Sequence, residues 1–209
     1  VDPHHFEPSA ADIAKAEDAD LLGLMEMENN GFDEHAALHD LVESLNARQK
    51  EASKHYAFVT LPKALLTEDR FFGGDAIMVA MIYRPALLTP SGDADVIPLP
   101  QQRYTAGGVT KSAGQRDSLV QRFTVAGSDA PLTLVVNHLK SKGSACFEDY
   151  PDYASADPLD GQGHCNALRV SAAKVLGEHL KDLAGDLLLI GDMNAYGMED
   201  PIRVLTDYD

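Results

Sequence analysis

The sequence has no long apolar run and no leader-like start. None of its apolar stretches approaches the roughly 20 residues that a membrane-spanning helix requires. The first residues, Val1 to His5, form neither a positively charged segment nor an apolar one, and residue 1 is not Met. We therefore expect no membrane span, and we expect a piece of a longer chain whose compartment cannot be taken from a signal peptide.

Basic residues are scarce as well. Lys and Arg number 17 against 33 Asp and Glu, which gives a formal net charge of −16. Such a charge repels a polyanion at long range, so a simple nucleic-acid binder with a basic groove is disfavoured. The acidity fits a protein that holds divalent cations, works in salty surroundings or releases cleaved product quickly. It fits equally well a secreted protein that its charge merely keeps soluble.

Only two cysteines occur, Cys146 and Cys165. The segment between them is rich in Asp, Pro and Gly and indicates a loop. A pair that flanks a loop is typical of a loop-closing disulfide in an oxidising compartment, and the alternative is two free thiols in a cytosolic protein.

Length and apolar content indicate one globular domain over residues 1–209, because 209 residues with 44% hydrophobic side chains can bury a sizeable core. Hydrophobic periodicity predicts an α/β fold with mixed strands. Strands are predicted at 20–26, 56–59, 76–83, 119–125, 132–136 and 186–190, and helices at 9–18, 34–48, 166–183 and from Asp200 onward. Residues 88–114 are rich in Pro, Gly, Asp and Thr and predict a long, partly mobile connection.

Polar residues stand where three predicted strands end. Glu26 closes the first strand, His138 follows the strand at 132–136, and Asp192 with Asn194 follows the last. Residues two apart in an extended segment point to the same face, so Asp192 and Asn194 can converge on one ligand. Glu26 adds an oxygen ligand of the hard type that Mg²⁺ prefers. Taken singly, Asp192 also fits a turn or helix cap, and His138 fits a core histidine.

Four phrases at these positions together resemble the endonuclease/exonuclease/phosphatase superfamily. They are Gly23–Glu26, Ile82–Pro85, Asn137–Gly143 and Gly191–Ala195, and their order and spacing match from about Asp20 to Tyr196. The resemblance is closest to bacterial extracellular nucleases. It implies a four-layered α/β/β/α sandwich of two mixed sheets with the active site across their top. It also implies that Cys146 and Cys165 form a disulfide.

The resemblance also implies roles for the residues. Glu26 matches the metal-binding glutamate, Asp192 the acid that aligns the attacking water, and Asn194 the amide that contacts the phosphate. His138 matches the histidine that donates to the phosphate or the leaving oxygen. Asp75, just before the strand at 76–83, is a candidate to hydrogen-bond His138 and fix its tautomer.

Further candidates are basic or lie in the loop between the cysteines. Arg116 resembles a phosphate-contacting arginine that precedes a strand, and Lys140 and Lys142 make a small positive island beside His138. The alternative for all three is an ordinary surface charge. The segment of Asp157, Asp160 and Gly161-Gln162-Gly163 offers carboxylates and loop carbonyls for Ca²⁺, although such Asp/Gly stretches are more often plain loops.

Two departures from the family pattern stand out. The family begins with a strand that carries an asparagine at the metal side and ends with a strand that carries an Asp-His pair, and neither is in this sequence. We expect a secreted, divalent-metal-dependent nuclease domain, incomplete at both ends, with Mg²⁺ as cofactor, Mn²⁺ as a substitute, nucleic acid, above all DNA, as substrate and no obligate protein partner. The alternatives are a phosphatase or phospholipid phosphodiesterase of the same superfamily and a non-catalytic acidic module that binds cations or a partner.

Overall fold

The computed structural model describes residues 19–143, 146 and 161–207, with only the backbone of residues 104, 106 and 111–113. The helix predicted at 9–18 and the loop acids Asp157 and Asp160 lie outside the described residues. The described residues divide into two compact units: 19–96, 119–136 and 185–189 belong to the first, and 97–118, 137–143, 146, 161–184 and 190–207 belong to the second. Among the described residues no helix is long and apolar enough to cross a membrane.

The first unit contains a three-stranded antiparallel sheet in the order β1-β3-β2. Its strands are β1 (Leu21–Glu28), β2 (Ala57–Phe58) and β3 (Ile77–Tyr83). The central strand β3 is buried from Met78 to Ile82 because it has a neighbour on each side, as its continuous apolar run predicts. The pairing of β1 with β3 is interrupted by a bulge between Leu24 and Met27.

The helix α2 (Ala37–Asn46) belongs to the same unit and confirms the predicted amphipathic helix. Leu38, Leu41, Val42 and Leu45 are its buried residues, at the spacing of one helix face. The short 3₁₀ turns η1 (Ala52–Lys54) and η2 (Lys63–Leu65) follow.

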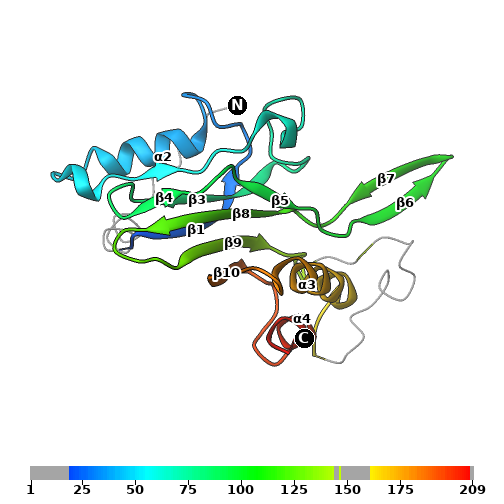
Figure 1. Cartoon of the computed structure of the whole chain (residues 1–209). Helices are drawn as coiled ribbons and strands as arrows, with labels where there is room; N and C mark the ends of the chain where they lie inside the picture. The colour runs from blue at the N-terminus through cyan, green and yellow to red at the C-terminus, as the bar shows by residue number, and fades with distance from the viewer. Residues whose placement is uncertain (1–18, 144–145, 147–160, 208–209) are drawn as a thin grey trace. The chain divides into compact units, whose positions relative to one another are not determined.

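A second sheet has the strand order β10-β9-β8-β4, and β5 also pairs with β8. Its strands are β4 (Leu88–Pro90), β5 (Asp95–Ile97), β8 (Ser118–Val125), β9 (Pro131–His138) and β10 (Asp186–Asp192). β8 and β9 form the predicted antiparallel pair (Figure 1). In its register Leu119 lies opposite Val136. The last residues of β9 and β10 belong to the second unit, and the candidate residues His138, Asp192 and Asn194 lie in that unit.

Two predictions about this part of the chain are wrong. Strand β10 exists, but it is not buried: Leu187 is 39% and Leu188 47% exposed, because β10 stands at the end of the strand order with β9 as its neighbour. Residues 88–114 do not form an irregular connection. They contain β4, β5 and a hairpin of β6 (Gln102–Ala106) and β7 (Val109–Ala113).

The second unit holds two helices, α3 (Asn166–Leu180) and α4 (Asp200–Thr206), which pack against each other (Figure 1). Helix α3 confirms the predicted helix at 166–183 and buries Leu168, Ala172, Leu176 and Leu180. Two principal sheets with helices make an α/β fold, as predicted.

Candidate functional site

The polar ends of β9 and β10 meet through the side chain of Asn137. This residue is fully buried, accepts a hydrogen bond from the Ser118 hydroxyl and donates from Nδ2 to the carbonyl of Ile190 at 3.1 Å. A buried amide of this kind must have its donors and acceptors satisfied. Asn137 therefore fixes the start of β8 and the end of β10 to the end of β9, directly beside His138.

Gly191 allows β10 to come this close to β9. Its φ angle is +129°, and a Cβ atom there would overlap the backbone carbonyl oxygen of Asn137. The amide of Leu139 donates to the carbonyl of Asp192 at 2.9 Å, which continues the contact beyond the strand ends. The glycine of the Gly-Asp-x-Asn phrase is thus required by close approach of two backbones.

His138, Asp192 and Asn194 are brought together by this contact. His138 is 5% exposed, and its Nε2 lies 3.9 Å from Oδ2 of Asp192, whose side chain is half exposed (50%). The other oxygen, Oδ1, accepts the backbone N–H of Asn194 at 2.8 Å, and Asn194 donates from Nδ2 to the carbonyl of Leu139 at 3.0 Å. A carboxylate that solvent can reach therefore stands beside a buried imidazole and a carboxamide. That the three groups act on one ligand stays a prediction.

Glu26 and Asp75 belong to the first unit. Glu26 is exposed in the bulge of β1 with φ +59°, and Asp75 is exposed and accepts the N–H of Ala76 at 2.7 Å. The buried side chain of Asn29 joins the two segments, since its Nδ2 donates to the carbonyls of Asp75 and Phe72 at 2.8 and 2.9 Å. The convergence of Glu26 with the second unit's residues and the bond from Asp75 to His138 stay predictions.

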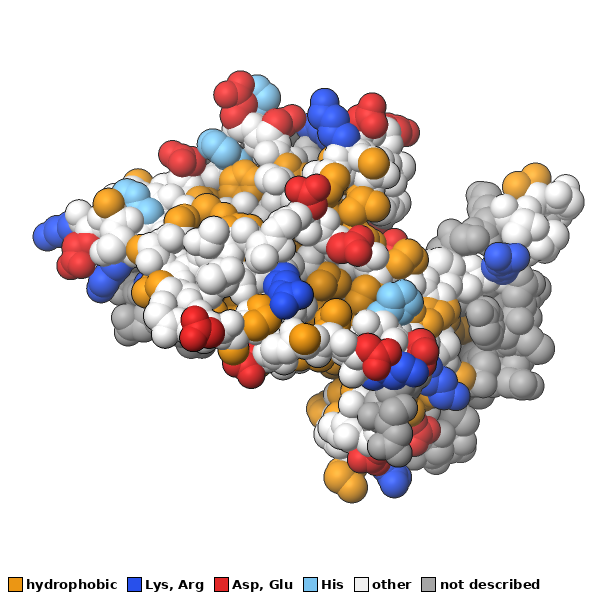
Figure 2. Space-filling view, viewed as in Figure 1, with side chains coloured by type: hydrophobic (Ala, Val, Ile, Leu, Met, Phe, Trp, Pro, Cys, Tyr) orange, Lys and Arg blue, Asp and Glu red, His pale blue; other side chains and the backbone are white. Residues whose placement is uncertain are grey.

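Cationic side chains gather around Lys140 in the second unit. Burial lowers the pKa of Lys140, and the nearby charges of Arg116 and Arg169 lower it further. Both arginines are therefore close enough to repel the Lys140 ammonium. Lys140, Arg116 and Arg169 therefore form a cationic group in a chain with a net charge of −16, and the binding of a phosphate by Arg116 and Lys140 stays a prediction. Figure 2 shows that the largest group of Lys and Arg side chains on its face lies beside acidic side chains.

Lys142 has partners of a different kind. Its Nζ lies 2.6 Å from Oε1 of the buried Glu199 and 4.5 Å from the ring centroid of Tyr196. A phosphate that bound Lys142 would compete with this ion pair. The predicted docking role of Lys142 thus stays a prediction, and its described contacts fix the turn between β10 and α4.

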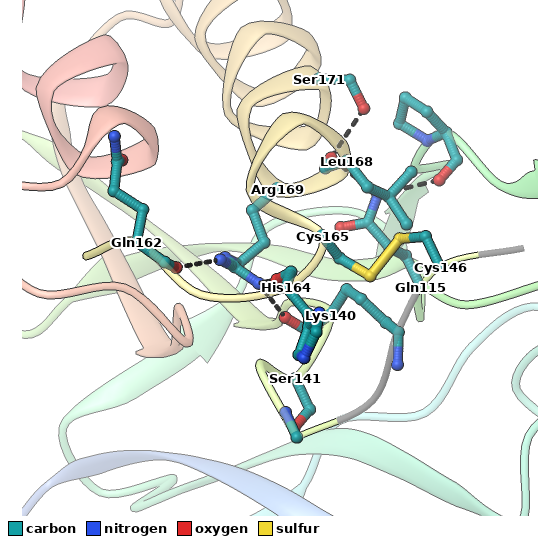
Figure 3. The surroundings of a disulfide bond; sticks show 12 residues. Gln115, Lys140, Ser141, Cys146, Gln162, His164, Cys165, Leu168, Arg169 and Ser171 are labelled. Carbon is teal, nitrogen blue, oxygen red and sulfur yellow. Dashed lines mark hydrogen bonds between the residues drawn. A yellow bond between two sulfur atoms is a disulfide. The ribbon is translucent and has the colours of Figure 1, made fainter. Parts of the chain in front are cut away.

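The predicted disulfide between Cys146 and Cys165 is confirmed (Figure 3). The two Cα atoms are 5.6 Å apart, and both cysteines are buried in a small apolar cluster with Leu168. Cys165 is also the N-cap residue of α3. The bridge therefore fixes the first turn of this helix to the segment that follows Lys142.

Removal of the bridge should lower stability. In a Cys146→Ser, Cys165→Ser variant we expect the free energy of unfolding to fall by about 3 kcal/mol, because the bridge closes a loop of 19 residues in the unfolded chain. Urea unfolding followed by circular dichroism measures it. The wild-type protein in excess reductant is the control and should match the variant, and an unchanged midpoint in both would contradict the prediction.

Arg169 is a residue that sequence reasoning missed. It is fully buried in the first turn of α3 and donates to the carbonyls of His164, Gln162 and Lys140 at 2.7, 2.8 and 3.1 Å (Figure 3). Burial lowers the pKa of Arg169, and Glu199 opposes that shift. No residue pattern in the sequence marks it, because its partners are backbone carbonyls. Arg169 thereby positions the segment of Lys140 against the disulfide.

The described residues contain no group of three or more His, Cys, Asp or Glu side chains placed to hold a metal ion. Of the predicted calcium loop, residues 161–163 are described. The side chain of Gln162 donates to Oδ2 of Asp200 at 2.8 Å and accepts the N–H of Asp200 at 2.8 Å. The side-chain amide of Gln162 therefore binds the first residue of α4.

No family model and no curated protein sequence matches the chain. Three solved structures show what its fold is similar to. The catalytic domain of human Nocturnin with a bound sulfate anion has a TM-score of 0.52 and 17% identity, covering 88% of this chain and 54% of that one. An endonuclease/exonuclease/phosphatase from Bacteroides vulgatus has a TM-score of 0.53 and 13% sequence identity, and the match covers 92% of this chain and 59% of that one. ANGEL2, a 2',3'-cyclic phosphatase in complex with adenosine-2',3'-vanadate, has a TM-score of 0.50 and 11% sequence identity, and the match covers 93% of this chain and 46% of that one.

These likenesses concern the fold. The chain spans about half of the length of the three structures. Over that span its two sheets and helices have the architecture of the endonuclease/exonuclease/phosphatase structures, which confirms the predicted fold class.

Proposed function

We propose that this chain, which has the fold of the endonuclease/exonuclease/phosphatase structures, is part of a divalent-metal-dependent enzyme that hydrolyses phosphodiester bonds in nucleic acid, DNA first. The observation that carries the proposal is the juxtaposition of His138 and Asp192, with Nε2 and Oδ2 3.9 Å apart. Asn194 is held beside them by its bonds to Asp192 and Leu139. One carboxylate, one imidazole and one amide suffice to position water, move a proton and contact a phosphate oxygen.

Each side chain has a separate part in the proposed reaction. Asp192, half exposed, accepts a hydrogen bond from the attacking water and orients it toward phosphorus. His138 donates to the phosphate or to the leaving oxygen, and its burial keeps bulk water from competing for that hydrogen bond. Asn194 donates to a non-bridging oxygen. Water attacks in line, so no covalent protein intermediate is needed.

The donor set suits Mg²⁺, and Mn²⁺ as a substitute. Mg²⁺ keeps several waters and is commonly held by one or two carboxylates together with substrate phosphate, so a preformed cluster is unnecessary. Glu26 is an exposed carboxylate at the bulge of β1 and is the residue that we propose as its ligand. When bound, the ion neutralises charge that develops on the phosphate.

Arg116 and Lys140 are the proposed contacts for the phosphate, and their mutual repulsion supports this assignment. Lys140 binds an anion when protonated and loses that ability as pH rises through its lowered pKa. We therefore expect sulfate affinity to fall at a lower pH than an ordinary lysine would give. Isothermal titration calorimetry with sulfate at a series of alkaline pH values measures this step, the fall in sulfate affinity as Lys140 loses its proton. The charge of sulfate is constant over that range.

The Lys140→Gln variant should bind sulfate weakly and lack the step, whereas Lys63→Gln, an exposed lysine in η2, should keep it. A step of the same size and position in Lys140→Gln would show that another group titrates.

A phosphatase or phospholipid phosphodiesterase is the second candidate, because ANGEL2, with a similar fold, is a 2',3'-cyclic phosphatase. The same residues would serve either reaction. The full-length protein should be offered plasmid DNA, sphingomyelin and an inositol phosphate in parallel. Preference for plasmid DNA supports the proposal, and turnover of either other substrate alone would overturn it.

We also propose secretion into an oxidising compartment. The buried disulfide supports this, because such bonds persist outside the reducing cytosol. Fractionation of the source cells, with the protein followed by antibody, tests it. Protein recovered with reduced cysteines from the cytosol would contradict it.

A further inference from the structure

An exposed aromatic side chain follows the candidate site. Tyr196 is 78% exposed and stands two residues after Asn194. Two residues of extended chain span about 7 Å at most, so the Cα atoms of Asn194 and Tyr196 are no farther apart than that. A ligand that contacts Asp192 and Asn194 is therefore within reach of the Tyr196 ring. One exposed apolar side chain is ordinary on a protein surface, so the way in which the ring is held decides its meaning.

The turn that carries Tyr196 is anchored on both sides. Before it, Asn194 donates from its backbone N–H to Asp192 and from Nδ2 to the carbonyl of Leu139, at 2.8 and 3.0 Å. After it, the N–H of the buried Glu199 donates to the carbonyl of Tyr196 at 2.8 Å. The backbone of the turn is thus fixed beside Asp192, and the exposed ring extends from a fixed place.

One face of the ring is covered by a cation. Nζ of Lys142 lies 4.5 Å from the centroid of the Tyr196 ring and 2.6 Å from Oε1 of Glu199. A cation is attracted to the negative face of an aromatic ring, and the ion pair with a buried carboxylate holds this one in position. Since Tyr196 is 78% exposed, the opposite face of its ring is open to solvent. The result is an aromatic ring with a restricted orientation and one free face.

The neighbouring site indicates what that face would bind. Asp192 and Asn194 are proposed to act on a phosphodiester of nucleic acid, and the flat group that a nucleic acid carries beside each phosphate is a base. Every base has a π face, so an aromatic side chain can stack on it without sequence preference. Bases that are unpaired or at an end of the strand offer that face, whereas bases inside a duplex have both faces covered.

We propose that Tyr196 is a stacking platform for an unpaired nucleobase that adjoins the phosphate at Asp192 and Asn194, with Lys142 supporting the ring from behind. The platform gives the site a preference for positions where a base can leave its stack. This inference deepens the proposed function and rests on it.

The first test is the affinity of the full-length protein for a labelled single strand of oligothymidylate, measured by fluorescence anisotropy in EDTA. Tyr196→Ala should weaken binding by about 5- to 150-fold, the loss that corresponds to one base stacked on an aromatic ring. Tyr196→Phe keeps the ring and should keep the affinity. Tyr196→Leu keeps an apolar side chain without a π face and should weaken binding nearly as much as Tyr196→Ala. Unchanged affinity in Tyr196→Ala or in Tyr196→Leu, or a wild type that does not bind, would overturn the proposal.

A matched variant in the same turn separates stacking from general apolar contact. Met198 is 83% exposed, and Met198→Ala should bind the strand as the wild type does. Equal weakening in Met198→Ala and Tyr196→Ala would mean that the turn offers only an apolar surface. Because both side chains are exposed, all of these variants should have the Tm of the wild type in thermal unfolding, which excludes loss of folding as the cause of weaker binding.

Two other ligands separate the base from the rest of the strand. An abasic strand of the same length keeps the sugars and phosphates, and Tyr196→Ala should bind it as the wild type does. Equal weakening on the abasic strand would mean that Tyr196 contacts the sugar-phosphate chain. A blunt duplex of the same length should be weakened less than the single strand, and equal weakening would overturn the preference for an unpaired base.

A fluorescent reporter can detect the stack directly. The 209 residues contain no Trp, so Tyr196→Trp adds an indole at this position, and the wild-type protein measured in the same way supplies the background. Stacking of a base on the indole should quench its emission as oligothymidylate is added, and the abasic strand should not. An emission that both strands quench equally, or that neither changes, would overturn the stack.

The platform and the proposed function can fail separately. If the protein cleaves DNA while Tyr196→Ala binds the strand as tightly as the wild type, the platform is wrong and the function stands. If no diester is cleaved but Tyr196→Ala binds the strand more weakly than Tyr196→Phe, the function is wrong and the platform stands.

Discussion

Substitution of Asp192 by Asn should lower kcat for DNA by 10²- to 10⁴-fold, the usual contribution of a group that activates water. The amide has nearly the shape of the carboxylate and can still accept the N–H of Asn194 through its oxygen, so the turn after β10 should persist. What disappears is the negative charge that orients and polarises the water. An interaction made mainly in the transition state lowers kcat and kcat/KM together when it is removed.

Asp186→Asn is the matched control, because Asp186 is an exposed carboxylate at the opposite end of the same strand. Its kcat should equal that of the wild type. The prediction concerns kcat at saturating DNA, with duplex affinity measured separately in EDTA. A kcat within tenfold of the wild type for Asp192→Asn, or an effect on KM alone, would show that Asp192 does not orient the attacking water.

Substitution of Gly191 by Ala should have the largest effect on stability, more than about 3 kcal/mol. Its Cβ would overlap the backbone of Asn137, and an L residue at φ +129° is strained whatever the space. Because backbone cannot rotate out of the way as a side chain can, β10 must move from β9. Thermal unfolding should show a fall in Tm of about 6–12 °C for a domain of this size.

Gly197→Ala serves as the control, since a Cβ there would meet no atom within 4 Å. It should unfold within about 2 °C of the wild type. A Gly191→Ala protein with the same Tm as that control would mean that β10 and β9 are not held as close as the hydrogen bonds of Asn137 and Leu139 indicate.

The sequence predicted the strands that carry the site because their apolar runs are bounded by polar residues. β9 and β10 both end where an apolar run meets His138 or Asp192. The convergence of Asp192 and Asn194 on one ligand, inferred from their two-residue spacing, stays a prediction. The disulfide was predicted because a loop-closing pair and the family resemblance agreed. These features depend on local pattern, which a sequence displays directly.

Other features depend on contacts that no local pattern specifies. Arg169 resembles any helical arginine in the sequence, and its partners are backbone carbonyls, which have no residue signature. The apolar run of β10 predicted a strand buried on both sides. In the described sheet β10 has β9 as its one neighbour, and its side chains are therefore exposed. The hairpin was missed although Gly107-Gly108 is a hairpin turn signal, because the surrounding prolines and threonines resembled a loop.

The dependence of DNA cleavage on Mg²⁺ in wild type, Glu26→Gln and Asp192→Asn tests the central claim most directly. The full-length wild-type protein should cleave plasmid DNA with Mg²⁺, stop in EDTA and recover when Mg²⁺ is restored. Glu26→Gln should regain activity as Mg²⁺ is raised to millimolar levels, because extra metal refills a weakened site, whereas Asp192→Asn should stay inactive. Cleavage that persists in EDTA would contradict metal dependence. Rescue of Asp192→Asn but not of Glu26→Gln would show that the metal ligand and the water-aligning acid are the reverse of those proposed.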